Sequence, residues 1–177
     1  MRLSTAAVLG LNDPADEQWA HLRGLQYSSL AKVTRYRMIM HLILAVLTVA
    51  VLRSEVAIWW LAPWAAALSY VHLRGMRFDN GLADTNKRRI TKEEFRYQLV
   101  TPVASGLLWS VALLVFAPQA GGVESAVVWT IVAVLITAST LFYTAAPLGI
   151  LVFAAIVGVA GLASLILQGL YPMACLL

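Results

Sequence analysis

Apolar residues in this chain gather in five long runs, which short polar or turn-forming segments separate. Each run approaches the ~20 residues that a helix needs to cross a bilayer, although the first two are slightly short. Runs of this length predict membrane-spanning α-helices rather than buried strands. The five predicted spans cover residues 38–52, 56–72, 99–117, 125–143 and 148–167.

The last residues of the chain look like the start of a further span. Tyr171-Pro172 is typical of a turn followed by a helix start, because proline is tolerated in the first turn of a helix. Residues 173–177 are apolar but far too few to cross a bilayer. Either this tail lies at the outer surface, or the chain is a piece of a longer protein whose next segment returns to the cytoplasm. The second interpretation is favoured.

A separate helix is expected before the first span. Asp13 suits the cap position and Pro14 the first turn, and acidic residues follow, as is typical of a helix N-terminus. Apolar residues then recur at helical spacing from Trp19 to Val33, and basic residues gather toward Arg37. The pattern predicts an amphipathic helix that continues into the first span. This helix either lies on the membrane surface or contacts another helix, in a dimer or in a partner.

Charge is distributed very unevenly, and this gives the predicted helices an orientation. Of the 13 Lys and Arg residues, five fall within residues 2–37 and seven within 74–96, and the one charged residue after Arg96 is Glu124. Basic residues that flank apolar spans are retained on the cytoplasmic side of a membrane. The N-terminus and the loop 73–98 are therefore expected in the cytoplasm, with Arg53 and Glu124 outside.

Composition agrees with a membrane protein. Hydrophobic residues make up 60% of the chain and charged residues 12%, against about 45–50% and about 25% in soluble domains. Because the basic residues flank the spans, the expected partner is the lipid bilayer with its anionic inner leaflet, and not nucleic acid. The predicted fold class is an all-α integral membrane protein. It is a polytopic helical bundle of five complete spans and a truncated sixth, divided into a cytoplasmic segment 1–37 and a transmembrane domain 38–177.

The sequence contains no residue pattern typical of a catalytic site. The predicted spans hold no Asp, Glu, Lys or Arg, whereas proton-coupled transporters keep an ionisable group near mid-membrane. The acidic residues of the basic loop, Asp79 among them, are expected to form a solvated face. The single Cys175 excludes an internal disulfide and a cysteine-based zinc site. We therefore expect neither an enzyme nor an energised transporter, and no cofactor or metal.

Two histidines near the cytoplasmic ends of the first two spans are the candidates for ligation. His41 lies one turn inside the first span and His72 at the end of the second, so a hairpin would bring them to similar depth. Bis-histidine ligation of haem or of a metal is then geometrically feasible. The commoner alternative is a pair of interfacial histidines bonded to the backbone or to lipid headgroups.

Small and hydroxyl-bearing residues follow one face of the fourth predicted span. Small residues let helices approach closely in lipid, and threonine can bond across such a contact. The pattern predicts packing between the fourth and fifth spans or between the protomers of a homodimer, and a ligand-lined face is the alternative. In the fourth span these residues are Ala126, Thr130, Ala133, Thr137, Thr140 and Thr144. The fifth span has corresponding small residues at Ala154, Gly158 and Gly161.

Three further residues suggest where a signal molecule would bind. Pro63 marks a kink in the second span, Trp109 lies near mid-membrane and outside the usual interfacial belt, and Trp129 lies in the fourth span. Kinks and large rings would then coincide between the second, third and fourth spans. Since no buried charge is available to pair with an ion, the signal is expected to be small and apolar or weakly polar.

Several stretches of the chain resemble a known family. They are 87–96 (KRRITKEEFR), 105–109 (SGLLW), 116–118 (FAP) and 145–149 (AAPLG), with the basic helix before the first span. From about Trp19 onward the chain is similar to the N-terminal membrane sensor region of bacterial cyclic di-GMP enzymes. These enzymes are diguanylate cyclases and phosphodiesterases with GGDEF and EAL domains. The resemblance implies six spans in the bacterial inner membrane, arranged in three hairpins, with the catalytic domains C-terminal and cytoplasmic.

Neither a GGDEF nor an EAL sequence occurs in this chain, so no catalytic or nucleotide-binding residue is carried over. The resemblance implies a sensory and dimerising membrane module that would regulate a C-terminal cyclic di-GMP output domain. The alternative is a stand-alone small membrane protein, either a facilitator or an accessory subunit of a membrane complex. Coding sequence beyond Leu177 would discriminate between the two.

Overall fold

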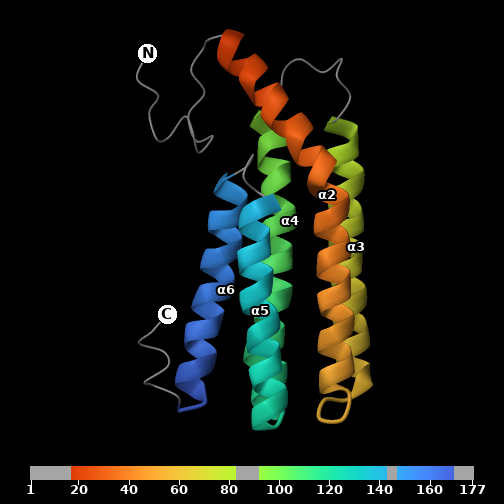
Figure 1. The fold of residues 1–177 in the computed structure, drawn as a ribbon, viewed down its shortest axis with the longest axis vertical. Coiled ribbons are helices and arrows are strands. Elements are labelled where there is room, and N and C mark those ends of the chain that lie inside the picture. The colour runs from red at the N-terminus through yellow and green to blue at the C-terminus, as the bar shows by residue number, and fades with distance from the viewer. Residues whose placement is uncertain (1–16, 83–91, 143–146, 170–177) are drawn as a thin grey trace.

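The computed structural model describes residues 17–82, 92–142 and 147–169, and in these ranges it contains helices and turns but no strand. Four predicted features lie outside these ranges: the helix start at Asp13, the basic residues 87–89, Thr144 and the truncated sixth span at 173–177. Successive helices run in opposite directions (Figure 1). They are α2 (Glu17–Leu52), α3 (Ile58–Leu82), α4 (Lys92–Val111) with the short η1 (Ala112–Phe116) and η2 (Ala117–Gln119), α5 (Gly122–Phe142) and α6 (Pro147–Leu167).

Within the described residues, four helical segments are long and apolar enough to cross a membrane. They are Lys32–Leu52, Tyr97–Gln119, Gly122–Leu141 and Pro147–Leu167, and they correspond to the first, third, fourth and fifth predicted spans. The segment predicted as the second span lies in α3, which is not among the four. Its Trp59, Trp60, Tyr70 and His72 lower its mean hydropathy. Even so, α3 packs antiparallel against α2 along the bundle (Figure 1).

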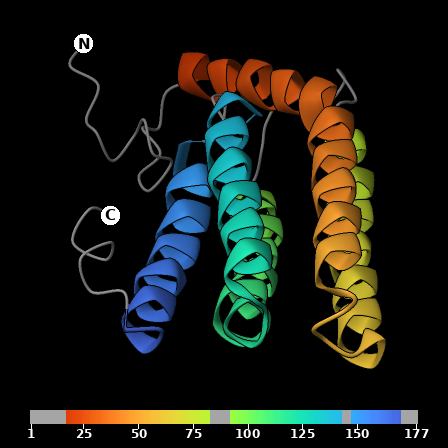
Figure 2. The ribbon, with the colours of Figure 1, turned by 60° about the horizontal axis from the view of Figure 1, so that its bottom comes forward.

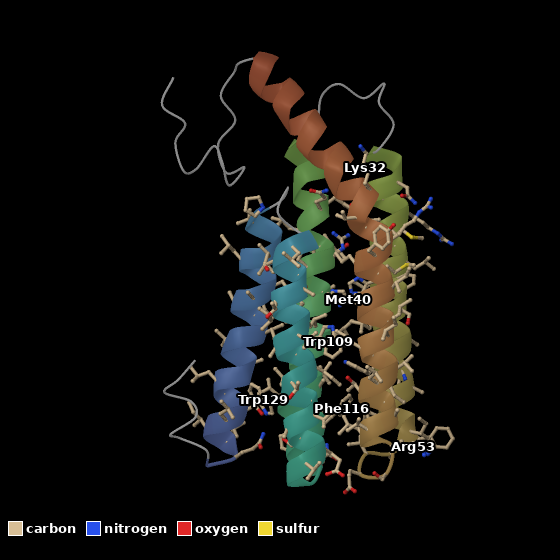
Figure 3. The ribbon with its side chains drawn as sticks, viewed as in Figure 1. Lys32, Met40, Arg53, Trp109, Phe116 and Trp129 are labelled. Atoms are coloured by element: carbon tan, nitrogen blue, oxygen red, sulfur yellow. The ribbon has the colours of Figure 1, made fainter. Side chains whose placement is uncertain are left out.

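Helix α2 joins two parts of the chain that the sequence analysis treated separately. It is one continuous helix from Glu17 to Leu52, so the expected N-terminal helix does continue into the first span. Figure 2 shows its first part lying across one end of the bundle and its second part turned down into it. Lys32 and Arg53 lie at opposite ends of the bundle (Figure 3). Helix α2 therefore connects the basic end of the molecule with its interior.

The bundle is apolar both inside and outside. Helix α2 packs against α3 and α5, and α4 packs against α3 and α6. Large apolar side chains also cover the outer surface. Such a surface is rare in soluble monomers, whereas the lipid of a membrane solvates it favourably. The fully buried core includes Leu61, Leu68, Trp109, Leu113 and Leu135, and the exposed set includes Val46, Leu141, Leu151 and Val159.

The third span ends in a short π-helical segment that the sequence analysis did not predict. There the Ala117 N–H bonds to the Ala112 carbonyl, so it is not donated to Leu113 as it would be in an α-helix. The residue that would continue the π pattern is Pro118, which has no N–H. The Leu113 carbonyl therefore lacks a backbone donor from either residue. Ser164 of α6 supplies one instead, since its Oγ donates to this carbonyl at 2.7 Å. The distortion thus fixes α6 against α4.

Replacing Ser164 by Ala is expected to destabilise the bundle by about 1–2 kcal/mol, because the Leu113 carbonyl is left buried without a partner. Ser139 offers a matched control: it is equally buried, and its Oγ has no hydrogen-bond partner within the described part of the chain. Ser139→Ala should therefore leave stability unchanged or slightly higher. Equilibrium unfolding in mixed SDS micelles, followed by circular dichroism, measures both, and equal losses would contradict the assignment.

Candidate functional site

Polar side chains line up on the inner faces of α2, α3 and α4, inside an otherwise apolar bundle. All are at most 4% exposed. Their spacings of three, four or seven residues place each set on one face of its helix. We call this group the polar seam; it consists of Thr34, Arg37 and His41 on α2, His72 and Asp79 on α3, and Ser105 and Trp109 on α4.

One end of the polar seam is a buried ion pair between α2 and α3. Arg37 Nη2 lies 2.7 Å from Asp79 Oδ2 and donates to Thr34 Oγ1 at 2.6 Å. Thr34 in turn donates to the same carboxylate oxygen. The expectation that Asp79 belongs to a solvated face is therefore wrong. The antiparallel hairpin places Asp79 beside Arg37. Burying a charge costs much free energy unless the charge is paired and hydrogen-bonded, and both conditions are met here.

The centre of the polar seam is a pair of stacked histidines. The rings of His41 and His72 lie 3.9 Å apart between centroids, at an interplanar angle of 33°. Trp109 donates its indole Nε1–H to His41 Nδ1 at 3.2 Å, and His72 Nε2 lies 3.1 Å from Ser105 Oγ. Because an indole N–H can only donate, His41 Nδ1 carries no proton in this arrangement. The stack therefore ties three helices together by hydrogen bonds between neutral groups.

The geometry of the stack differs from both interpretations of the histidines. The rings are brought together as expected, but they are in van der Waals contact, which leaves no space for a haem between them. Within the described residues, no group of three His, Cys, Asp or Glu side chains is placed to hold a metal ion. The histidines are also not interfacial. They are buried, and they bond to side chains of α4 instead of to the backbone or headgroups.

Aromatic rings pack against His41 of the stack and against one another. The Trp64 ring meets Trp109 edge-on at 5.3 Å and Phe116 at 5.9 Å, and Phe153 of α6 meets His41 at 6.0 Å. Trp64 also donates its Nε1–H to the Leu108 carbonyl at 2.7 Å. Each edge-to-face contact between rings contributes about 0.5–1.5 kcal/mol of stability beyond the contribution from burying the rings. Because both histidines are almost fully buried, the stack is a shielded site deep in the bundle.

The structure does not bring together the three residues of the predicted signal pocket. Trp109 is fully buried in the polar seam, about half way along the bundle (Figure 3). Pro63 is exposed, because its neighbour Trp64 is the residue of that turn that faces inward. Trp129 lies against α6, where a Cβ at Gly161 would come within 3.0 Å of its ring. Trp109 alone therefore belongs to the buried polar site.

The small-residue face of α5 points out of the bundle. Ala126, Thr130, Ala133 and Thr137 are exposed, and both threonines donate at 2.9 Å to carbonyls of their own helix. Gly158 is also exposed, and a Cβ added to it would meet nothing within 4 Å. Within one chain these residues do not pack α5 against α6. Packing between protomers remains a prediction.

Residue spacing could have revealed most of the polar seam. Thr34, Arg37 and His41 are separated by three and four residues, and His72 and Asp79 by seven, which are helical spacings. Polar residues that share a face at the end of an apolar span were a signal for an inward seam. The contribution of Ser105 had no such signal, because one serine in an apolar helix usually bonds to its own backbone.

The polar seam combines hydrogen bonds between neutral groups at its centre with one paired set of charges at its end. A neutral or weakly polar molecule could exchange hydrogen bonds with the histidines, whereas an ionic one would have to displace Arg37 or Asp79 from its partner. Comparisons with family models, with curated proteins and with solved structures find no match to this chain. Its function must therefore be inferred from the geometry of the site.

Proposed function

We propose that the chain is a membrane-embedded sensory and dimerising module that regulates a C-terminal cytoplasmic cyclic di-GMP output domain. One observation carries the proposal: α2 contributes Thr34, Arg37 and His41 to the polar seam and continues without a break to Glu17. A change in the seam then acts on a helix that extends beyond the bundle. The resemblance to cyclic di-GMP sensor regions supplies the kind of output.

The proposed mechanism is a shift between two arrangements of the polar seam. A ligand shifts such an equilibrium only as far as its affinity differs between the two arrangements. In one of them Trp109 donates to His41 and His72 contacts Ser105. A small, weakly polar signal that takes over one of these hydrogen bonds would favour a second arrangement. Because α2 carries His41, its cytoplasmic part would move with the change.

The experiment begins with the coding DNA beyond Leu177. Further apolar residues followed by a GGDEF-like or EAL-like domain support the sensory module, and a stop codon there favours a stand-alone facilitator or accessory subunit. The natural reading frame is then expressed with Trp109 changed to Phe, and cellular cyclic di-GMP is measured while candidate signals are titrated. Loss of one hydrogen bond of about 1 kcal/mol should shift the response roughly fivefold. Trp60→Phe, at an exposed position, should not shift it, and an unaltered response in both variants would overturn the proposal.

The proposed topology counts α3 as a membrane span, the second of five along the chain, with the N-terminus of the chain in the cytoplasm. Its support is the positive-inside distribution of the basic residues together with the antiparallel arrangement of α2 and α3 (Figure 1). Reporter fusions after Ala31 and at Asp84 are expected to report cytoplasm, and a fusion at Gly121 to report periplasm. A periplasmic signal at Asp84 would refute this topology.

The proposed homodimer would form through the exposed face of α5. Replacing Ala133 by Leu is expected to weaken self-association by about 1–2 kcal/mol, because the larger side chain prevents close helix approach. Ala66→Leu is the control, since Ala66 is also exposed but lies on α3, whereas Val132 and Leu135 are core residues of α5. Energy transfer between labelled chains in liposomes measures association. Equal effects at Ala133 and Ala66 would count against a specific α5 interface.

A further inference from the structure

A groove separate from the polar seam opens between α3 and α4 near the basic end of the bundle. Its volume is about 150 Å³. Tyr70, Arg74, Phe78 and Tyr97 contribute aromatic and cationic groups to it, and Val100 and Ala104 are among its apolar residues. No part of the proposed signalling mechanism uses this groove.

Arg74 is held at the groove by its neighbours. Its Nη2 donates to the hydroxyl of Tyr97, and its guanidinium carbon lies 5.4 Å from the centroid of the Tyr97 ring. The Phe78 ring also packs against Tyr97, with a centroid distance of 4.8 Å. A guanidinium carries five N–H donors. Among the side chains that the structure describes, which leave out those of 92–96, no carboxylate lies within ion-pair distance of Arg74, so most of its donors are available to an anion.

The depth of the groove follows from a close approach of the two helices. A Cβ at Gly75 would come within 2.7 Å of Thr101 Oγ1, so a larger residue there would push α3 and α4 apart. Below Arg74, Tyr70 and Val100 are 63% and 48% exposed on the lipid-facing side. The groove therefore has a cationic end and an apolar side that is open to the hydrocarbon.

The level of the groove along the bundle determines which molecules reach it. The apolar span of α4 begins at Tyr97, the residue to which Arg74 is bonded. Arg74 and Tyr97 thus lie at the boundary between the apolar span and the basic segment, where lipid headgroups and tyrosine side chains gather. Arg77, one turn along α3, is exposed at the same end and adds a second positive charge.

We propose that this groove binds an anionic phospholipid of the cytoplasmic leaflet. Arg74 donates to the headgroup phosphate, for which the planar guanidinium is well suited, and an acyl chain lies along Val100 and Ala104. Basic pockets between spanning helices on the cytoplasmic side bind anionic headgroups by this combination of contacts. The site gives the module a specific lipid requirement in addition to its general attraction to a charged leaflet.

The test is lipid retention by the full chain in nanodiscs of phosphatidylcholine with and without phosphatidylglycerol, measured by native mass spectrometry after release. Salt at about 0.5 M suppresses general attraction between exposed charges. We expect preferential retention of phosphatidylglycerol, and a loss of roughly tenfold or more in Arg74→Gln, because hydrogen bonds to a charged group are removed. Tyr97→Phe removes the hydroxyl that positions Arg74 but keeps the ring that lines the groove. It should therefore lose only part of the phosphatidylglycerol retention.

Arg35→Gln is the matched control, because Arg35 is an exposed arginine of α2 near the same end of the bundle. It should retain phosphatidylglycerol like the unaltered chain. Equal losses in Arg74→Gln and Arg35→Gln, or no preference in the unaltered chain, would overturn the proposal. A third arm adds inorganic phosphate: failure to compete supports a lipid ligand, and full competition at millimolar concentration would overturn it in favour of a free phosphate.

Discussion

Replacing Asp79 by Ala is expected to destabilise the bundle by about 3–5 kcal/mol, the range found when one partner of a buried ion pair is removed. The carboxylate accepts from both Arg37 and Thr34 in a site where all three side chains are almost fully buried. Without it, the guanidinium of Arg37 loses its counter-charge inside the bundle. Equilibrium unfolding in mixed SDS micelles, followed by circular dichroism, measures the loss.

Two further variants separate the ion pair from a general effect of charge. Arg77→Ala removes an exposed charge of the same helix and should change stability by no more than about 0.5 kcal/mol. The double replacement Arg37→Met with Asp79→Leu removes both charges and should recover most of the loss. If Asp79→Ala cost no more than Arg77→Ala, the buried pair would not be a feature of the folded protein.

Replacing Trp109 by Ala should be comparably severe, at about 3–5 kcal/mol, because a large buried ring is exchanged for a cavity. The side chain is fully buried, meets the Trp64 ring edge-on at 5.3 Å and donates to His41. Its removal also leaves the Nδ1 of His41 without this donor. The same unfolding assay applies, with circular dichroism as the signal because the fluorescence of the chain itself changes.

Trp59 provides the control for Trp109, since it is 82% exposed on α3. Trp59→Ala should cost much less, as its ring faces the surroundings and leaves no internal cavity. Trp109→Phe should cost less than Trp109→Ala, because the six-membered ring still fills most of the space. A loss at Trp59 that equals the loss at Trp109 would contradict the packing described for the polar seam.

The helices themselves were predictable from the sequence, and the spacing of polar residues marked part of their inner faces, whereas the apolar parts of those faces were not predictable. Four apolar runs became helices able to span a membrane, because length and composition alone define such segments. Lipid-facing and core-facing residues are equally apolar, so the periodicity that marks the inner face of a soluble helix is weak here. For this reason the small residues of α5, Ala133 among them, gave no indication that they face outward.

Long-range partners account for the other differences. Asp79 looked like a loop residue because its neighbours are basic and polar, but its environment is set by Arg37, 42 residues earlier in the chain. Trp109 was recognised as unusual from its depth alone, although its bond to His41 required the structure. The π-helical turn depends on Pro118 and on Ser164 of α6 together. Each of these features is a contact between helices, which local sequence patterns do not encode.

The central claim is that a change in the polar seam is passed along α2 to the first part of that helix, for which we propose a cytoplasmic location. The direct measurement is a spin-label distance in liposomes between position 28, on the first part of α2, and position 81, near the end of α3, with Cys175 replaced by Ser. It is made with Trp109 intact and changed to Phe, and with Trp60→Phe as control. A shifted distance distribution in the Trp109 variant alone is predicted. An unshifted distribution in a folded Trp109→Phe chain would contradict the claim.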